Sequence, residues 1–445
     1  MKQLRRGMSQ WAHHIKNTLW LLSDKGLALF VGFFVTAYVA RVYGPNNFGL
    51  FSYCLSLVAI FSVAGHAGLN ALVVKRLVDS DSDKSVIMGT SIAIKGVGFF
   101  VGLICLLGYS FYPGIHTPAE RSMLGILCLS LIVQPGLVLD FWFQAHYAAR
   151  YQAIAKHLGL LAASTAKVLA ASMGASILWI AGATVLQSVV VVISLVFFYL
   201  ITTRPGLSRW RFDIVEAKSL AKKGSLVFLG TFFATIYLKI DQVMLKILIG
   251  DGAVGVYAVA ATISEAVYFI PMAITAAVFP RLVELRSYDP TKYEMRTQQL
   301  LDGLAILAML LALGLSLIAS PLISVVFGTE YSEAATLLAI HIWASIFIFM
   351  RSVFSKWIVA EDLLRFSLIT HGAGAVINVV INSLLIPAMG GMGAAIATLI
   401  SYAMASYLSL ALFPSTRIMF YMMSLALVAP FRYVPRLREM VNGQS

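Results

Sequence analysis

The chain has 445 residues, of which 60% are hydrophobic and only 12% are charged, and its formal net charge is +13. This apolar fraction is far above that of ordinary soluble domains, so the composition excludes a soluble globular protein. The basic residues lie in short segments between apolar runs instead of gathering on one polar face. Membrane topology therefore explains the positive charge better than nucleic-acid binding does. We predict an all-α polytopic membrane protein without a nucleic-acid partner.

Apolar runs recur along the chain, and each has about 20 residues, which is enough to cross a bilayer as a helix. A lipid-exposed backbone must satisfy its own hydrogen bonds, and the runs are longer than barrel strands of about 9–11 residues, so helices are required. The first run is interrupted by Asp24 and Lys25 and is followed by Arg41, so we interpret it as a retained span and not as a signal peptide. The twelve predicted spans lie near residues 17–40, 48–73, 86–111, 121–145, 153–173, 177–201, 224–249, 253–279, 299–319, 335–358, 366–386 and 391–412.

The loops between these spans differ in charge from one side of the membrane to the other. Nearly all loop Lys and Arg fall on alternate loops that form one side, whereas the opposite loops offer only Arg41. Because Lys and Arg accumulate on the cytoplasmic side, we expect both termini in the cytoplasm and the protein in a bacterial inner membrane. Residues 416–430 are apolar but short, so we favour an interfacial helix over a thirteenth span.

The longest basic connection follows the sixth predicted span and divides the chain into two halves. The segment from Gly44 can be laid over the segment from Gly250 without a gap, which indicates parallel repeats with a site at their interface. Two turns that share glycines for geometric reasons would also explain this match. We expect an N-terminal six-helix lobe at residues 1–201, a cytoplasmic basic linker at 202–223, a C-terminal six-helix lobe at 224–413 and a cytoplasmic or interfacial tail at 414–445.

Charged side chains inside the spans are the main functional candidates, because insertion of each into a bilayer costs about 2.5–3.5 kcal/mol unless water or a partner solvates it. Positive charge exceeds negative charge there, which favours a cavity for an anionic substrate. Glu265 and Asp24 are candidate coupling groups, although Glu265 could equally form a salt bridge with one of the cations. Lys25 could also snorkel to the interface. The candidate substrate-binding cations are Lys239, Arg351, Lys167, Lys95 and Lys25.

No motif in the sequence argues for catalysis. There is no GxSxG, HExxH or P-loop pattern, and neither the cysteines nor the histidines within the spans have metal-ligand spacing. We therefore predict a protein that is not an enzyme and that has no catalytic residue, metal or cofactor. Gly98 and Gly102 form a GxxxG pattern, which is typical of close helix packing in membranes.

Three segments, at residues 40–70, 237–271 and 377–402, carry a family resemblance. In the second of them, Asp241 and Tyr257 fit the family pattern together with the glycines at positions 250 and 255. These segments resemble the polysaccharide transporters of the multidrug/oligosaccharidyl-lipid/polysaccharide exporter superfamily, and the Wzx-type O-antigen flippases in particular. The resemblance implies two six-helix lobes in a V that open alternately to either side, around a cationic lumen.

The function implied by this resemblance is transfer of an undecaprenyl-diphosphate-linked oligosaccharide from the cytoplasmic to the periplasmic leaflet by alternating access. Besides this substrate and the membrane lipids, the implied partners are H⁺ or Na⁺ as a coupling ion, a polysaccharide polymerase and a chain-length regulator. A cation-coupled drug exporter, or an exporter of another lipid, is an alternative within the superfamily. A membrane polysaccharide polymerase is less favoured, because the predicted external loops are short and nearly uncharged.

Overall fold

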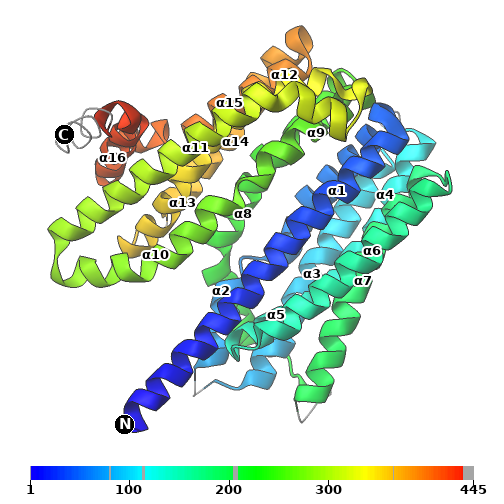
Figure 1. Cartoon of the computed structure of the whole chain (residues 1–445). Helices are drawn as coiled ribbons and strands as arrows, with labels where there is room; N and C mark the ends of the chain where they lie inside the picture. Colours follow the sequence, from blue (N-terminus) through cyan, green and yellow to red (C-terminus); the bar gives the residue numbers. More distant parts are fainter. Residues whose placement is uncertain (1, 80–81, 113–115, 204–208, 364, 434–445) are drawn as a thin grey trace. The chain divides into compact units, whose positions relative to one another are not determined.

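The computed structural model describes residues 2–79, 82–112, 116–203, 209–363 and 365–433, with only the backbone of residues 2–25. Within these ranges the secondary structure is helical and contains no strand (Figure 1). The chain forms two compact units, Met1–Thr235 and Ile236–Ser445. The boundary between them falls inside one long helix, α8 (Ile214–Leu248). The predicted linker is therefore helical from Ile214 onward, and its helix continues directly into the next span.

The N-terminal unit is a bundle in which α1 packs against α3 and α6, and α6 packs against α7. Its core contains large buried side chains such as Phe143 and Leu195. Local signals begin its helices: the Thr117 hydroxyl accepts a hydrogen bond from Glu120 N while the Glu120 carboxylate accepts one from Thr117 N, a reciprocal capping box. The helices are α1 (Lys2–His66), α2 (Asn70–Val78), α3 (Lys84–Ser110), α4 (Pro118–Val133), η1 (Gln134–Leu137), α5 (Val138–Ala145), α6 (Ala149–Ser172) and α7 (Ile177–Thr202).

The C-terminal unit is also helical, and its most extensive helix pairing joins α14 and α15. Its apolar core is built around buried residues of α11, α13 and the C-terminal helix α16, including Phe349, Phe354 and Met423. Beyond the end of α8, its helices are α9 (Asp251–Ala266), α10 (Phe269–Tyr288), α11 (Pro290–Val326), η3 (Thr329–Tyr331), α12 (Glu333–His341), η4 (Ile342–Ala344), α13 (Ser345–Ala360), α14 (Arg365–Met389), α15 (Gly391–Ser406), η5 (Leu408–Leu412), η6 (Pro414–Thr416) and α16 (Arg417–Leu427).

Eleven helical segments among the described residues are long and apolar enough to cross a membrane. They match the twelve predicted spans, because the first segment, Gly26–Val78, covers two of them. Its 53 residues would extend about 80 Å as one helix, far more than the hydrocarbon thickness of about 30 Å. The helix is broken at Gly44, where φ is 71° and ψ is 171°. The all-α polytopic fold is thus confirmed.

The break at Gly44 has a counterpart in the C-terminal unit. Gly250, which the sequence comparison pairs with Gly44, precedes α9 with a φ of 132°. Both positions therefore need a backbone conformation that residues with a Cβ rarely adopt. Because geometry alone requires glycine at both turns, this pair does not by itself establish a common origin of the two halves.

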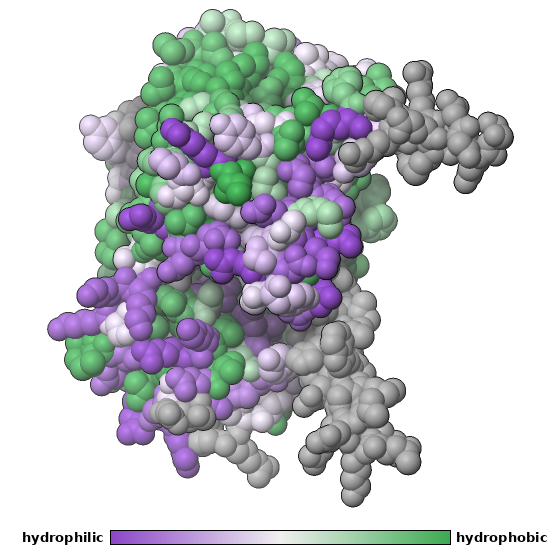
Figure 2. Space-filling model, turned by 90° about the vertical axis from the view of Figure 1, so that its left-hand side faces the viewer, coloured by the Kyte–Doolittle hydropathy of each residue, from purple (hydrophilic) through white to green (hydrophobic). Residues whose placement is uncertain are grey.

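The outer surface and the C-terminal segment fit a membrane protein. Large apolar side chains point outward, and Leu317, for example, is 74% exposed. Figure 2 shows broad hydrophobic areas beside a hydrophilic region on one face. Helix α16 has 11 residues, about 17 Å in length, and packs against α11. It is too short to cross a bilayer by itself. Its interfacial placement stays a prediction.

Candidate functional site

A buried carboxylate lies at the centre of a polar cluster in the C-terminal unit. Asp241, on the last part of α8, is only 2% exposed. The Tyr257 hydroxyl, on α9, donates a hydrogen bond to Asp241 Oδ2 over 2.7 Å. The Thr398 hydroxyl, on α15, donates to the same oxygen, and Asn382 Nδ2, on α14, donates to Oδ1. Three helices therefore direct neutral polar side chains at one carboxylate on a fourth helix, α8.

The groups that contact this carboxylate directly are neutral hydrogen-bond donors. Among the described residues, no Lys, Arg or His forms an ion pair with Asp241. Asn378 adds a further oxygen, since its Oδ1 accepts a hydrogen bond from Asn382 Nδ2 over 3.0 Å. Asn378 and Asn382 are fully buried, and Asn378 Nδ2 and Asn382 Oδ1 are buried without a hydrogen-bond partner. Burial of an unpaired charge is costly, so this oxygen-rich cluster suits a proton or a small monovalent cation.

Two of the predicted site residues meet beside this cluster. Lys239, two residues before Asp241 on α8, forms a salt bridge with Glu265 of α9, with Nζ 3.3 Å from Oε2. Both side chains are 29% exposed, so the pair is neither fully buried nor fully solvated. The structure therefore shows the salt-bridge alternative for Glu265 that the sequence had left open.

Arg351, by contrast, is only 5% exposed and is held by the protein itself. Its guanidinium donates hydrogen bonds to the Ala405 carbonyl and, over 3.2 Å, to the Thr370 hydroxyl. Ala405 lies in the last turn of α15, where carbonyl groups lack intrahelical partners and a cation is favourable. In this conformation, Arg351 caps the C-terminus of α15.

The remaining predicted residues belong to the N-terminal unit. Lys95, on α3, is 4% exposed, and its Nζ lies 5.5 Å from the ring centroid of Phe99 and 5.2 Å from that of Phe141. Lys167, on α6, is partly exposed, with Nζ 5.9 Å from the ring centroid of Phe51. These contacts are within the range of cation–π interactions. The predicted Asp24 and Lys25 lie outside the residues whose side chains the structure describes.

Sequence reasoning recognised Asp241 and Tyr257 but missed the asparagines and the threonine that surround the carboxylate. A signal was present, because Asn378 and Asn382 are four residues apart and therefore lie on one face of α14. Both asparagines and Thr398 also fall in the third segment of the family resemblance, at residues 377–402.

The fold is that of a polytopic helical membrane protein. Residues 14–286, more than half of the chain, match the model of a family described as "Polysaccharide biosynthesis protein". The chain therefore belongs to this family of polysaccharide transporters. It is 26% identical to "Probable flippase AglR" of Haloferax volcanii over 392 residues. This alignment covers 86% of this chain and 80% of that protein.

Solved structures show the same fold at low sequence identity. A lipid II flippase MurJ in an inward closed conformation has a TM-score of 0.70 at 14% identity, with 93% of this chain and 91% of that chain covered. An inward-facing multidrug resistance MATE family transporter of the MOP superfamily has a TM-score of 0.72 at 14% identity, with 94% and 99% covered. The chain thus has the same fold as these two transporters.

Proposed function

We propose that this protein is a flippase that moves an undecaprenyl-diphosphate-linked oligosaccharide, such as an O-antigen repeat unit, from the cytoplasmic to the periplasmic leaflet. The observation that carries the proposal is that the chain belongs to the polysaccharide biosynthesis family. The residues that match the family model, 14–286, include most of the N-terminal unit and the start of the C-terminal unit. Related sequences include a probable flippase. A bacterial inner membrane with both chain termini in the cytoplasm fits the loop charges.

The cations within the spans support an anionic substrate. A diphosphate carries negative charge into the membrane, where charge-assisted hydrogen bonds to Lys or Arg are strong. Lys239 and Lys95 are the leading candidates, with Lys167 and Lys25 as further members. Arg351 would have to break its hydrogen bond to the Ala405 carbonyl before it could bind a phosphate, so it is the weaker candidate for phosphate binding.

Coupling to a cation is the second part of the proposal. Asp241 would bind H⁺ or Na⁺, because its buried carboxylate and the neighbouring amide and hydroxyl oxygens offer oxygen ligands, and no salt bridge among the described residues occupies the carboxylate. Glu265 would respond to substrate through its salt bridge, since an anionic headgroup near Lys239 competes with the Glu265 carboxylate. Asp24 remains a further candidate coupling group.

The proposed cycle is alternating access, in which an N-terminal lobe (1–201) and a C-terminal lobe (224–413), joined by the linker at 202–223, rock against each other. The two compact units support such lobes, although they divide the chain within α8. A polysaccharide polymerase and a chain-length regulator would receive the product on the periplasmic side.

The experiment that tests the function is deletion of the gene followed by complementation with this chain. If the protein is a flippase, lipid-linked repeat units should accumulate on the inner leaflet of the deletion strain. Surface polysaccharide should return on complementation. Accumulation on the outer leaflet would indicate a polymerase instead. Restored drug resistance without restored polysaccharide would indicate a drug exporter.

A further inference from the structure

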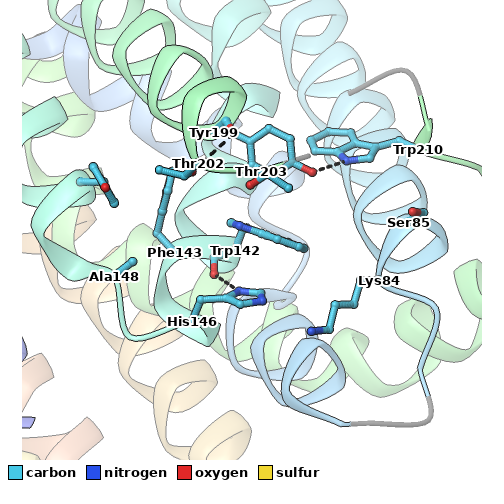
Figure 3. A pocket seen from close by; sticks show the side chains of 11 residues that line it. Lys84, Ser85, Trp142, Phe143, His146, Ala148, Tyr199, Thr202, Thr203 and Trp210 are labelled. Carbon is cyan, nitrogen blue, oxygen red and sulfur yellow. Dashed lines mark hydrogen bonds between the residues drawn. The ribbon is translucent and has the colours of Figure 1, made fainter. Parts of the chain in front are cut away.

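A cavity of about 470 Å³ lies in the N-terminal unit, where the start of α3, the end of α7 and the segment after α5 meet (Figure 3). Lys84 and Ser85 line it from α3, Trp142 from α5, Tyr199 from α7 and Trp210 from the segment before α8. It lies in a different unit from the Asp241 cluster, and none of its lining residues was predicted as a site residue.

The wall of this cavity is a packed set of aromatic rings. Trp142 stacks on His146, with ring centroids 4.1 Å apart, and makes an edge-to-face contact with Tyr199 at 5.4 Å. In Figure 3, Trp142 lies between these two rings. Trp210 Nε1 donates a hydrogen bond to the Tyr199 hydroxyl over 3.0 Å, and their rings also meet edge to face. The contacts on both sides of Trp142 hold the wall in place before any ligand binds.

Among the described residues, the Lys84 ammonium and one ring nitrogen of His146 lack a protein partner. The His146 Nδ1–H donates to the Trp142 carbonyl over 2.8 Å, because a carbonyl can only accept, so Nε2 is the free nitrogen of the ring. Among the described residues, Lys84 has no ion pair and its ammonium has no hydrogen bond. The adjacent Asp83 does not neutralise it, because that carboxylate caps α3 and pairs with Arg211. Figure 3 shows Lys84 and His146 on the same side of Trp142.

The position of the cavity along the helices indicates what it binds. Two membrane-spanning helices end here, since α3 begins at Lys84 and α7 ends at Thr202. Helix ends of this kind lie near the level of the lipid headgroups, where Trp, Tyr and Lys are enriched. A soluble anion would leave the aromatic wall unfilled, and an uncharged ligand would leave the ammonium unpaired. An amphiphile with an anionic head satisfies both.

We propose that this cavity binds the phosphate headgroup of a membrane lipid, with Lys84 at the phosphate and with the rings of Trp142 and Trp210 against the adjoining part of the lipid. Two sources share this chemistry, an anionic phospholipid of the bilayer and the diphosphate end of a polyprenyl lipid. The proposal does not depend on the transport function, because a resident phospholipid would bind there in any membrane protein with this cavity.

The test uses the full chain in phosphatidylcholine nanodiscs and a dansyl-labelled phosphatidylglycerol, whose binding is followed by energy transfer from the tryptophans. Lys84→Gln should weaken binding about tenfold, since a hydrogen bond to a charged group is lost. Lys84→Arg should retain binding. Lys75→Gln is the matched control, because Lys75 is an exposed lysine at the end of α2 that does not line the cavity, and it should bind as the wild type does.

Unlabelled competitors then distinguish the two sources. Displacement by phosphatidylglycerol supports a resident phospholipid, and displacement by undecaprenyl diphosphate alone supports the carried lipid. The proposal is overturned if Lys84→Gln binds as tightly as the wild type, if Lys75→Gln loses as much affinity, or if unlabelled phosphatidylcholine competes equally well.

Discussion

The Tyr257 hydroxyl donates a hydrogen bond to the Asp241 carboxylate over 2.7 Å, and this bond joins the helices on either side of the Gly250 turn. Because the same carboxylate also accepts hydrogen bonds from α14 and α15, a proton or cation that binds there competes with contacts that hold four helices together. Occupancy of the site and packing of the C-terminal unit are therefore coupled. Two-state coupling of this kind is what a transport cycle requires.

The first prediction is that Asp241→Asn abolishes transport while the protein still folds. The amide keeps the shape of the carboxylate but removes its charge. Its one remaining oxygen can still accept hydrogen bonds, so we expect a loss of about 1–3 kcal/mol in stability that leaves the protein folded. Surface polysaccharide in a complemented null strain measures transport, and detergent-solubilised thermal unfolding measures stability with and without Na⁺ or at different pH. The variant should lose any cation-dependent stabilisation that the wild type shows.

Asp251→Asn is the matched control for this prediction. Asp251 is partly exposed and pairs with Lys246 over 2.6 Å, so loss of its charge leaves the buried cluster intact. This control should keep both transport and cation dependence. Transport by Asp241→Asn at the wild-type rate, with the same dependence on the cation, would rule out a coupling role for Asp241.

The second prediction concerns the Lys239–Glu265 salt bridge. At their present exposure the two charges stabilise each other by about 1 kcal/mol, so each single alanine variant should lower the unfolding free energy slightly and the double variant should recover part of it. If Lys239 binds the substrate phosphate, the double variant should remain inactive in polysaccharide export. Export restored in the double variant would show that the pair is structural only.

Much of the fold could be predicted from the sequence, because long apolar runs and the charge of the loops directly reflect the bilayer. The first two predicted spans lie on either side of Gly44, where the structure breaks the helix. The site was harder, since its contacts join residues far apart: Asn382 and Thr398 are 141 and 157 residues from Asp241. The capping role of Arg351 also could not be predicted, because it depends on where α15 ends beside α13.

The third prediction is topological and follows from the loop charges. Reporter fusions after Lys84, Lys223 and Arg296 should report the cytoplasm, because these residues lie in the Lys- and Arg-rich segments between the predicted spans. Fusions at three positions on the other side should report the periplasm, namely His116, Asp251 and Glu330. A reporter from either set on the opposite side would contradict the twelve-span arrangement.

The fourth prediction separates the two roles of Arg351. As a helix cap with buried hydrogen bonds, Arg351→Ala should lower the unfolding free energy by about 2 kcal/mol and reduce the amount of inserted protein. Arg351→Lys should recover part of the stability, since an ammonium can reach one acceptor but cannot keep the planar two-acceptor geometry. Export per molecule of inserted protein should stay near the wild-type value in both variants. Full insertion with abolished export in Arg351→Lys would instead assign the guanidinium to the substrate.

The last prediction compares two glycines of α3 that differ only in their surroundings. A Cβ at Gly98 would overlap the carbonyl oxygen of Ala64 on α1, whereas a Cβ at Gly96 would meet no atom within 4 Å. Gly98→Ala must push α1 and α3 apart, and overpacking of this kind costs about 1–3 kcal/mol. Gly96→Ala should instead stabilise the protein by about 0.5–1 kcal/mol, because glycine is unfavourable inside a helix. Unfolding of both purified variants in mixed detergent should therefore shift in opposite directions from the wild type, and equal shifts would show that α1 and α3 do not depend on close contact at Gly98.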